Sequence, residues 1–171
     1  MCGIFGQLTA NPEKINDGYI KILGMDNVSR GKDSCGIFLD GEIYTGVYAE
    51  SDFNKFIKGR YFKPNTYPVV FGHTRKASSG NVSRENAHPF GFGELDNGDF
   101  RFIGVHNGTI YNDDELAEEF KISTKVKEPM NGGRSFFHRN KIDSQILLEI
   151  LTKNTPKRDF SVLEKYEGGA A

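Results

Sequence analysis

The first eight residues constrain the fold more than any other part of the chain. Cys2 to Leu8 form a short, uncharged run punctuated by glycine, which is typical of a buried strand. Chain ends usually fray, so a strand that begins at the second residue implies that the terminus is held inside the fold. The 20 glycines among 171 residues agree with this, because many turns and close backbone approaches suit a β-rich domain better than a helical bundle.

The charge and the composition exclude several classes of protein. With 22 Lys and Arg against 23 Asp and Glu, the formal net charge is −1, which argues against a dedicated nucleic-acid binder. The apolar residues, 37% of the chain, include no long run that could span a membrane. Two cysteines are too few for a disulfide framework, and no secretory signal precedes them. We therefore expect one folded domain, cytoplasmic, with no contact to nucleic acid or membrane.

Helix and turn signals divide the rest of the chain. Apolar residues recur at helical spacing in four stretches, which we expect to form helices: 11–24, 113–120, the stretch that starts at Asp143, and 159–167. Asn11, Asn112 and Asp143 stand at the starts of three of them, as N-caps do. Asp40-Gly41 is typical of a hairpin turn, and the β-branched run from Val69 to His73 indicates an interior strand.

Cys2 becomes the first residue once Met1 is removed, as is usual before so small a side chain. It then carries both a thiol and an α-amine, whose ordinary pKa values are about 8.5 and about 7.7 to 8.0. The amine can therefore take the proton of the thiol, directly or through one water, and the nucleophile supplies its own base. The alternative is an ordinary buried cysteine in a strand, which is the commoner case.

Three further segments carry groups suited to an amino acid substrate. Arg75 enters a loop at the end of a strand, where a guanidinium could bind a carboxylate through two parallel hydrogen bonds. Asp143 could accept hydrogen bonds from an ammonium group, and Asn107-Gly108 could offer an amide and a backbone N–H to an oxyanion. Each also has a simpler interpretation: a surface ion pair, an N-cap and a hairpin turn, respectively. Only their combination favours a binding site.

The sequence carries no motif that indicates a metal or a cofactor. Its four histidines lack the spacing of a zinc site on one helix face, and we interpret them as structural or supporting groups: His73, His88, His106 and His138. Cys35 fits a small core residue. No P-loop and no strand-linked Gly-x-Gly-x-x-Gly is present, so we expect a protein that works without a cofactor.

Six segments resemble the motifs of a known family, the class II glutamine amidotransferases. Five of them follow the family order: Cys2 to Gly6, Arg30 to Ile37, Gly72 to Arg75, Asn86 to Phe90, and His106 to Ile110. Asp143-Ser144-Gln145 is similar to the Asp-Ser/Thr-Glu that the family carries at a helix start. The resemblance implies the N-terminal-nucleophile (Ntn) hydrolase fold, an α+β αββα sandwich of two antiparallel sheets between helical layers.

The resemblance also implies a reaction and the residues that perform it. Cys2 would attack the side-chain amide of L-glutamine, release ammonia and form a thioester, and water would then release L-glutamate. Asn107 and Gly108 would line the oxyanion hole, while Arg75 and Asp143 would hold the α-carboxylate and the α-ammonium group. The ammonia would normally pass to a synthase domain or subunit.

Three residues receive supporting roles from the same resemblance. Ser78, where the family often has Thr, could add a hydrogen bond to the substrate. Arg30 stands near the nucleophile and orders the terminal segment, and His88 organises a loop. Lys76 and Ser79 depart from the aromatic residue and the His that sugar-phosphate aminotransferases often carry there, so the acceptor of the ammonia is not defined.

The extent of the chain bears on which function to expect. Residues 1–171 are expected to form one glutaminase domain, incomplete at its C-terminal end, since family domains usually continue past Glu167 into further strands. A retained Met1 would block the amine and leave the enzyme inactive. Two alternatives therefore stay open: a non-catalytic module that binds glutamine or a partner, and an Ntn amidase that acts on another amide. Arg75 with Asp143 argues against the second, because together they select a free α-amino acid.

Overall fold

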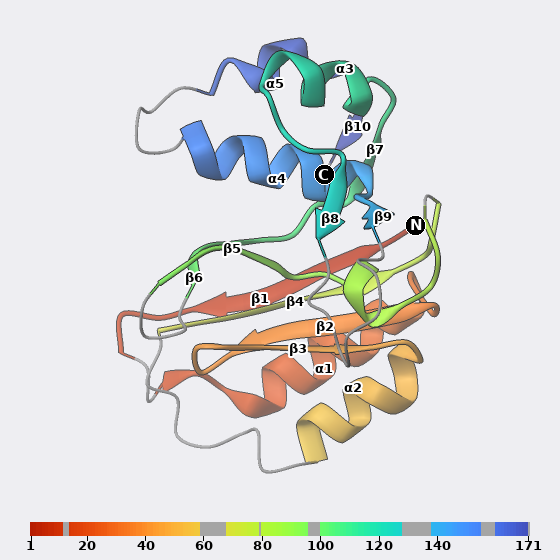
Figure 1. The fold of residues 1–171 in the computed structure, drawn as a ribbon. Helices are drawn as coiled ribbons and strands as arrows, with labels where there is room; N and C mark the ends of the chain where they lie inside the picture. The colour runs from red at the N-terminus through yellow and green to blue at the C-terminus, as the bar shows by residue number, and fades with distance from the viewer. Residues whose placement is uncertain are drawn as a thin grey trace, which may run out of the picture. The chain divides into compact units, whose positions relative to one another are not determined.

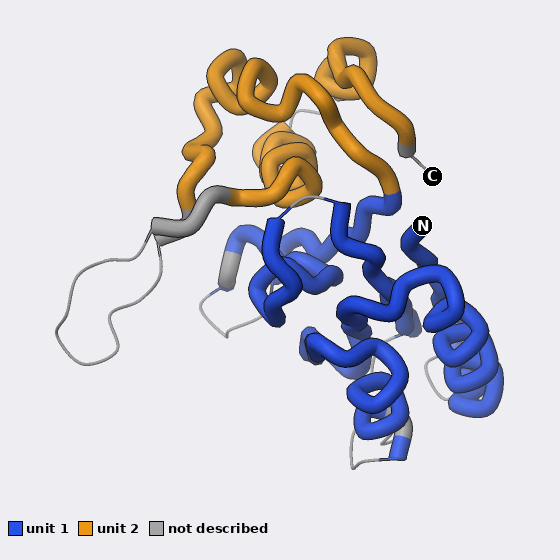
Figure 2. The backbone as a smooth tube through the Cα atoms, turned by 90° about the vertical axis from the view of Figure 1, so that its right-hand side faces the viewer, with its two compact units in different colours: residues 1–107 blue, residues 108–171 orange. Residues whose placement is uncertain are grey.

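The computed structural model describes residues 1–11, 14–58, 68–78, 80–95, 100–127, 138–154 and 160–170. The chain divides into two compact units, Met1–Asn107 and Gly108–Ala171, which Figure 2 draws in different colours. Each unit has its own hydrophobic core and is described by itself. No helix in the described part of the chain is both long and apolar enough to cross a membrane.

The first unit is organised by a four-stranded antiparallel sheet. Its strands are β1 (Gly3–Leu8), β4 (Val69–Arg75), β2 (Ser34–Leu39) and β3 (Glu42–Gly46), in that spatial order. The predicted strand at the start of the chain is confirmed, as is the predicted interior strand that starts at Val69. The hairpin turn expected at Asp40-Gly41 is also confirmed: both residues adopt positive φ, 52° and 87°, as a primed turn requires.

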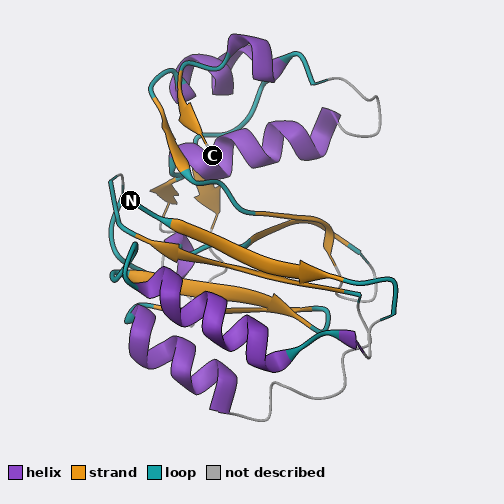
Figure 3. Cartoon of the chain, turned by 180° about the vertical axis from the view of Figure 1, so that it is seen from behind, coloured by secondary structure: helices purple, strands orange, loops and turns teal. Residues whose placement is uncertain are grey.

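Two helices cover one face of this sheet (Figure 3). They are α1 (Asp17–Val28) and α2 (Ala49–Lys58). Beneath them lies the core of the unit, which includes Phe5, Ile20, Ile37, Phe53 and Val70. The rings of Phe5 and Phe53 meet edge to face, with 5.3 Å between their centroids. This face is therefore apolar and closed.

The other face of the sheet carries different side chains because successive residues of a strand point to opposite sides. Phe71 and His73 project there, and Phe71 packs on Phe38 at 5.5 Å between ring centroids. The hairpin of β5 (Phe90–Glu94) and β6 (Phe100–Gly104) lies on this side, opposite to α1 and α2 (Figure 1). A short 3₁₀ helix, η2 (Arg84–Asn86), precedes the hairpin.

In its described residues, the second unit contains two small antiparallel pairs and three helices. The pairs are β7 (Gly108–Ile110) with β10 (Gly168–Ala170), and β8 (Lys125–Lys127) with β9 (His138–Asn140). The helices are α3 (Asp113–Glu119), α4 (Asp143–Asn154) and α5 (Val162–Lys165). Apolar side chains of the helices, of β7 and of the segment after α3 form its core: Ile110, Leu116, Ala117, Ile122, Ile146, Leu147, Ile150 and Val162.

The start of the first helix differs from the prediction. The expected N-cap was Asn11, but α1 begins at Asp17 and its cap is Asn16, whose Oδ1 accepts the Tyr19 N–H at 3.0 Å. The side chain of Gln7 in β1 fixes this start, because its Oε1 accepts the Asn16 N–H at 2.8 Å. The helix also continues past Gly24. This glycine does not end the helix; it has no side chain, and the ring of Phe53 packs where a Cβ would be.

Three other helix expectations were incomplete or wrong. Helix α2 was not predicted. Asn112 is the N-cap of α3, as expected, yet its side chain makes no capping bond; it bonds the carbonyl of Lys165 and the N–H of Glu167 instead. Of the helix expected over 159–167, residue 159 lies outside the described residues. The rest forms only the single turn α5, and the chain enters β10 at Gly168.

Candidate active site

The backbone carbonyl of Cys2 is held from two directions. Arg30 donates to it from Nε at 3.1 Å, and Asn107 donates from Nδ2, also at 3.1 Å. Arg30 follows α1, and Asn107 follows β6 in the chain, so two distant segments converge on the residue ahead of β1. These two hydrogen bonds hold the start of the chain in place, whereas a terminus without such bonds would fray.

The sulfur of Cys2 lies against the backbone just after β4. The Lys76 N–H donates to Sγ at 3.3 Å, and the thiol donates to the Lys76 carbonyl at 3.5 Å. Asp33 braces this segment: its N–H donates to the Arg75 carbonyl at 3.0 Å, and its carboxylate accepts the Ala77 N–H at 2.8 Å. The half-buried Cys2 side chain is thus positioned beside the residue that follows Arg75.

Arg75 ends β4 with its side chain almost entirely buried, 4% exposed. Its Nη1 donates to the carbonyl of Asn81 at 3.2 Å, and the same carbonyl accepts Nδ2 of Asn86 at 3.0 Å. The guanidinium therefore lies under the loop that follows β4, and Ser78 lies exposed in that loop. The alternative of an ordinary surface residue is wrong for Arg75, because the side chain is buried.

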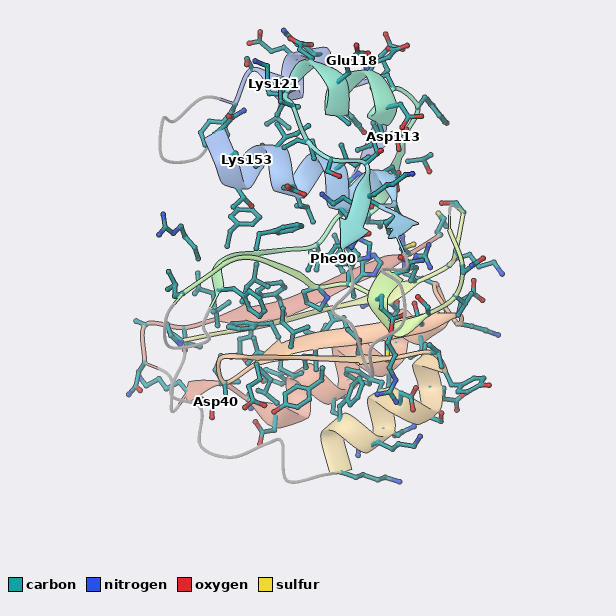
Figure 4. The ribbon with its side chains drawn as sticks, viewed as in Figure 1. Asp40, Phe90, Asp113, Glu118, Lys121 and Lys153 are labelled. Carbon is teal, nitrogen blue, oxygen red and sulfur yellow. The ribbon has the colours of Figure 1, made fainter. Side chains whose placement is uncertain are left out.

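Three histidines are buried in the same unit. The ring of His73 stacks near that of His88, 4.3 Å between centroids, and His88 lies 4.4 Å from the ring of Phe90, which Figure 4 labels on β5. His106 is also buried and directly precedes Asn107. Their burial agrees with the structural interpretation of these residues, while the side chain of His138 lies outside the described residues.

Burial sets the charge state of these rings. It lowers the pKa of His73 to about 3, and the charges of Arg75 and His106 act in the same direction. Burial also lowers the pKa of His88 well below its usual range, with further contributions from His73, His106 and Arg75. Both rings are therefore neutral at pH 7, and the buried cation in their surroundings is Arg75.

His88 also meets the sheet through its backbone. A Cβ on Gly36 of β2 would lie 2.2 Å from the His88 carbonyl oxygen, so only glycine allows this approach. The segment before β5 thus packs directly on the middle of the sheet. A role for His88 in organising that loop stays a prediction.

Gly108 and Asp143 belong to the second unit. Gly108 opens β7, which pairs with β10 and not with β6, so the hairpin-turn interpretation of Asn107-Gly108 is wrong. Asp143 is buried at the first residue of α4. Its Oδ2 accepts the Ile110 N–H at 2.9 Å, and Oδ1 accepts the Ser144 hydroxyl at 3.4 Å. The carboxylate therefore ties α4 to β7 and does not cap its own helix as predicted.

The structure brings Cys2, Arg30 and Asn107 together within the first unit and places the Cys2 sulfur beside the backbone that follows Arg75. A pocket that Cys2 and Arg75 share with Asp143 stays a prediction.

Three residues near this site were missed as functional candidates from the sequence: Asp33, Asn81 and Asn86. Asp33 and Asn86 lie inside segments that resemble family motifs, and that was the available signal. Asp33 bonds backbone groups of Arg75 and Ala77 far along the chain, and periodicity or spacing cannot reveal such contacts. Asn86 bonds the Asn81 carbonyl, five residues before it. Asn81 acts through its main-chain carbonyl, so its side chain carried no signal at all.

Comparisons with known proteins agree on one family, although no protein-family model matches the chain. It is 28% identical over 169 residues to a glutamine–fructose-6-phosphate aminotransferase (isomerizing) of Lactococcus lactis subsp. lactis, covering 98% of this chain and 24% of that protein. It is 34% identical over 125 residues to the enzyme of the same name from Staphylococcus aureus, covering 70% of this chain and 19% of that protein. The chain thus spans a quarter or less of the length of these relatives.

Two solved structures share the fold. The allosteric regulatory enzyme of purine biosynthesis aligns with a TM-score of 0.62 at 22% identity, over 100% of this chain and 34% of that one. The glutamine phosphoribosylpyrophosphate amidotransferase of B. subtilis aligns with a TM-score of 0.58 at 22% identity, over 99% of this chain and 33% of that one. Both confirm an α+β fold with antiparallel sheets. With Cys2 fixed by Arg30 and Asn107, the chain is homologous to class II glutamine amidotransferases.

Proposed function

We propose that this chain hydrolyses L-glutamine to L-glutamate and ammonia through a thioester on Cys2. The observation that carries the proposal is the fixation of Cys2: two side chains hold its carbonyl while its sulfur lies beside the segment that follows Arg75. A structural cysteine in a strand needs no such anchoring from three distant segments.

The first half of the reaction forms the thioester. Once Met1 is removed, the α-amine of Cys2 takes the thiol proton, and Sγ attacks the side-chain carbonyl carbon of glutamine. The carbonyl oxygen becomes an oxyanion as the tetrahedral intermediate forms. When the C–N bond breaks, the α-ammonium group returns the proton to the leaving nitrogen, and ammonia departs. A γ-glutamyl thioester remains on Cys2.

The second half regenerates the enzyme. The α-amine accepts a proton from water as the water oxygen attacks the thioester carbonyl carbon. The C–S bond then breaks and the thiolate takes the proton back from the α-ammonium group, so that L-glutamate and the free thiol are released. No external oxidant, metal or cofactor enters the atom and electron balance.

Asn107 is assigned to the oxyanion hole together with the Gly108 N–H. A side-chain amide carries two N–H donors. One Asn107 donor is used on the Cys2 carbonyl, and this bond orients the amide so that the second can point to an oxyanion beside the nucleophile. The amide would thus fix the nucleophile and stabilise the charge that its attack creates.

Substrate selection is assigned to Arg75, Asp143 and Ser78. Arg75 would bind the α-carboxylate of glutamine, and the burial of its side chain would strengthen that pairing. Asp143 would accept from the α-ammonium group, using carboxylate lone pairs beyond those bound by Ile110 and Ser144. Ser78 would add one hydrogen bond from the loop. Arg30 and His88 would act by positioning the terminus and the segment before β5.

The fold proposed for this function is the αββα sandwich of two antiparallel sheets. Helices α1 and α2 on one face of the four-stranded sheet, and the β5–β6 hairpin on the other, support this arrangement. The relatives are three or more times longer than the matched region, and their names describe amino transfer to fructose 6-phosphate. We infer that the ammonia made here passes to a synthase domain or subunit.

Glutaminase assays on two cysteine variants test the proposal. Cys2→Ala should abolish turnover, because the nucleophile and the thioester are both lost. Cys35→Ala is the matched control and should keep turnover, since that thiol is buried in the core. Equal activity of the wild type and Cys2→Ala would refute the assignment of the nucleophile.

Intact-mass spectrometry of the same samples separates the remaining alternatives. Loss of Met1 together with turnover supports the enzyme. Retained Met1 with glutamine binding but no turnover would indicate a non-catalytic binding module. Turnover that Arg75→Lys leaves unchanged in KM for glutamine would indicate an amidase for another amide.

A further inference from the structure

The sulfur of Cys2 lies against two adjoining peptide units of one short segment. The Lys76 N–H, 3.3 Å from Sγ, belongs to the peptide unit that joins Arg75 to Lys76. The Lys76 carbonyl oxygen, 3.5 Å from Sγ, belongs to the next unit, which joins Lys76 to Ala77. One N–H donor and one C=O acceptor are therefore presented to the same sulfur atom, and the proposed reaction as written uses neither of them.

Asp33 holds both of these peptide units at their far ends. In a trans peptide the N–H and the C=O point in opposite directions. The Asp33 N–H donates to the Arg75 carbonyl at 3.0 Å, opposite the Lys76 N–H, and its Oδ2 accepts the Ala77 N–H at 2.8 Å, opposite the Lys76 carbonyl. Neither Lys76 group can therefore turn away from Sγ without breaking a hydrogen bond to Asp33.

The segment that carries Asp33 packs closely on the end of β4. A Cβ on Gly31 would lie 2.6 Å from the Thr74 carbonyl oxygen and 2.7 Å from the Arg75 carbonyl carbon, so the two backbones are in direct contact. Arg30, one residue earlier, donates to the Cys2 carbonyl at 3.1 Å. The same short segment thus fixes Cys2 at its carbonyl and fixes the peptide units that meet its sulfur.

The two Lys76 groups favour opposite protonation states of the sulfur. The carbonyl accepts a hydrogen bond from the thiol and has no donor once the proton leaves. The N–H donates to the sulfur in both states and more strongly to the thiolate, because a hydrogen bond to an ionised group is roughly twice as strong as a neutral one. A thiol is only a weak donor. The N–H therefore outweighs the carbonyl, and the segment favours the thiolate.

We propose that the main-chain N–H of Lys76 is a further catalytic group, which stabilises the Cys2 thiolate while the α-amine holds the thiol proton. The N–H keeps its bond to Sγ until the C–S bond of the thioester forms, and it binds the thiolate again when that bond breaks. The proton passes between Sγ and the α-amine, and the Lys76 N–H gives up no proton. This role rests on the proposed function, in which Cys2 is the nucleophile.

The charge of the Lys76 side chain is a separate influence on the sulfur. Its Nζ lies 3.7 Å from Oδ1 of Asp33, and the side chain is 62% exposed. Water and salt screen an exposed ion pair of this kind, whereas the N–H acts in direct contact with Sγ. The segments that contact Cys2 carry other charged or titratable side chains of both signs, which include Arg30, Lys32, Asp33, Arg75 and His106.

A pair of substitutions at residue 76 separates the main chain from the side-chain charge. The rate at which iodoacetamide labels Cys2, followed from about pH 6 to 10 by peptide mass spectrometry, reports formation of the thiolate. Lys76→Pro removes the N–H, and the extended backbone that proline requires before it is available in Arg75 at the end of β4. The midpoint of labelling should rise by about one pH unit, since a hydrogen bond to a charged group is lost.

Lys76→Ala is the matched control for this variant. It removes the ammonium group and keeps the N–H, so the midpoint of Cys2 labelling should stay at the wild-type value. Circular dichroism shows whether each variant is folded.

Backbone NMR of the ¹⁵N-labelled full chain tests the contact without changing Lys76. The amide proton of Lys76 should move downfield as the pH rises, because the thiolate is a stronger acceptor than the thiol. The midpoint of this shift should equal that of Cys2 labelling. Cys2→Ala lacks the thiol and keeps the α-amine once Met1 is removed, so the shift should disappear in that variant.

Three results would overturn the proposal. One is a folded Lys76→Pro chain with the wild-type midpoint of labelling. Another is Lys76→Ala that raises the midpoint as much as Lys76→Pro, which would assign the effect to the ammonium group. The third is a Lys76 amide proton that does not titrate or that titrates equally in Cys2→Ala, and this result decides the matter if Lys76→Pro does not fold. Neither measurement depends on turnover, so failure here is distinguishable from a failed glutaminase assay.

Discussion

The two faces of the four-stranded sheet are built from the same strands and perform different tasks. On the face under α1 and α2, Phe5, Cys35 and Val70 join the apolar core. On the other face, His73 and Arg75 are buried polar side chains, and the N–H of Lys76, the residue after Arg75, donates to the Cys2 sulfur. The alternation of side chains along a strand makes this separation possible, because neighbouring residues can serve stability and chemistry independently.

The two faces contribute differently to the free energy of folding. Polar groups that are buried lose their hydration, and partners must compensate them. The apolar face supplies the favourable burial that a unit with such a polar interior needs. We therefore expect changes on the helix-covered face to affect the free energy of unfolding, and changes on the other face to affect turnover.

The two thiols should show the largest contrast. Burial in the core, with the charge of Asp52 adding to it, raises the pKa of Cys35 to about 12. At pH 8 its thiolate fraction would be on the order of 1 in 10⁴, and its burial excludes reagent as well. Iodoacetamide should therefore label the half-exposed Cys2 and leave Cys35 unmodified in the native chain, as peptide mass spectrometry can show. Comparable labelling of both thiols in the folded protein would contradict a closed apolar face.

A pair of alanine variants tests the separation of stability from turnover. Asn107→Ala should lower kcat by about 10²- to 10³-fold with little change in the unfolding midpoint, since an oxyanion donor is lost. Phe53→Ala should lower the free energy of unfolding by about 3–5 kcal/mol, because a fully buried ring is lost from the core, and should leave kcat of the folded fraction unchanged. Urea titrations and glutaminase assays on both proteins provide the measurements. A loss of stability in Asn107→Ala, together with a loss of kcat in Phe53→Ala, would contradict the separation of stability from turnover.

A smaller effect is expected from pH. The pKa of His73 is about 3 in the folded chain and near its ordinary value of 6.5 after unfolding, so the unfolded chain binds more protons between these values. His73 therefore makes the folded state progressively less stable as the pH falls from about 6.5 towards 3. His73→Gln should flatten the pH dependence of the urea midpoint between pH 6.5 and 4, relative to the wild type. An unchanged slope would show that His73 does not remain neutral in the fold.

Many candidate site residues could be named from local sequence because they lie in compact motifs. The terminal strand, the Asp40-Gly41 turn and the candidates Cys2, Arg30, Arg75 and Asn107 each rest on residues that are adjacent in the chain. What failed were expectations that depended on distant partners. Asn16 displaced Asn11 as the helix cap because Gln7 bonds its backbone. The Asp143 carboxylate accepts the Ile110 N–H of β7 and the Ser144 hydroxyl, where an N-cap would accept a backbone N–H of its own helix.

The sequence by itself determined the chemistry that the chain can offer: a cysteine that removal of Met1 would make terminal, a guanidinium at a strand end, and an Asn-Gly pair after another strand. These follow from residue identity and short-range spacing. Only the tertiary structure decided that Arg30 and Asn107 share one carbonyl, that His73 and His88 are neutral, and that β4 lies between β1 and β2 in the sheet. The physical reason is that hydrogen-bond partners, burial and strand neighbours arise from segments far apart in the chain, and no local pattern encodes them.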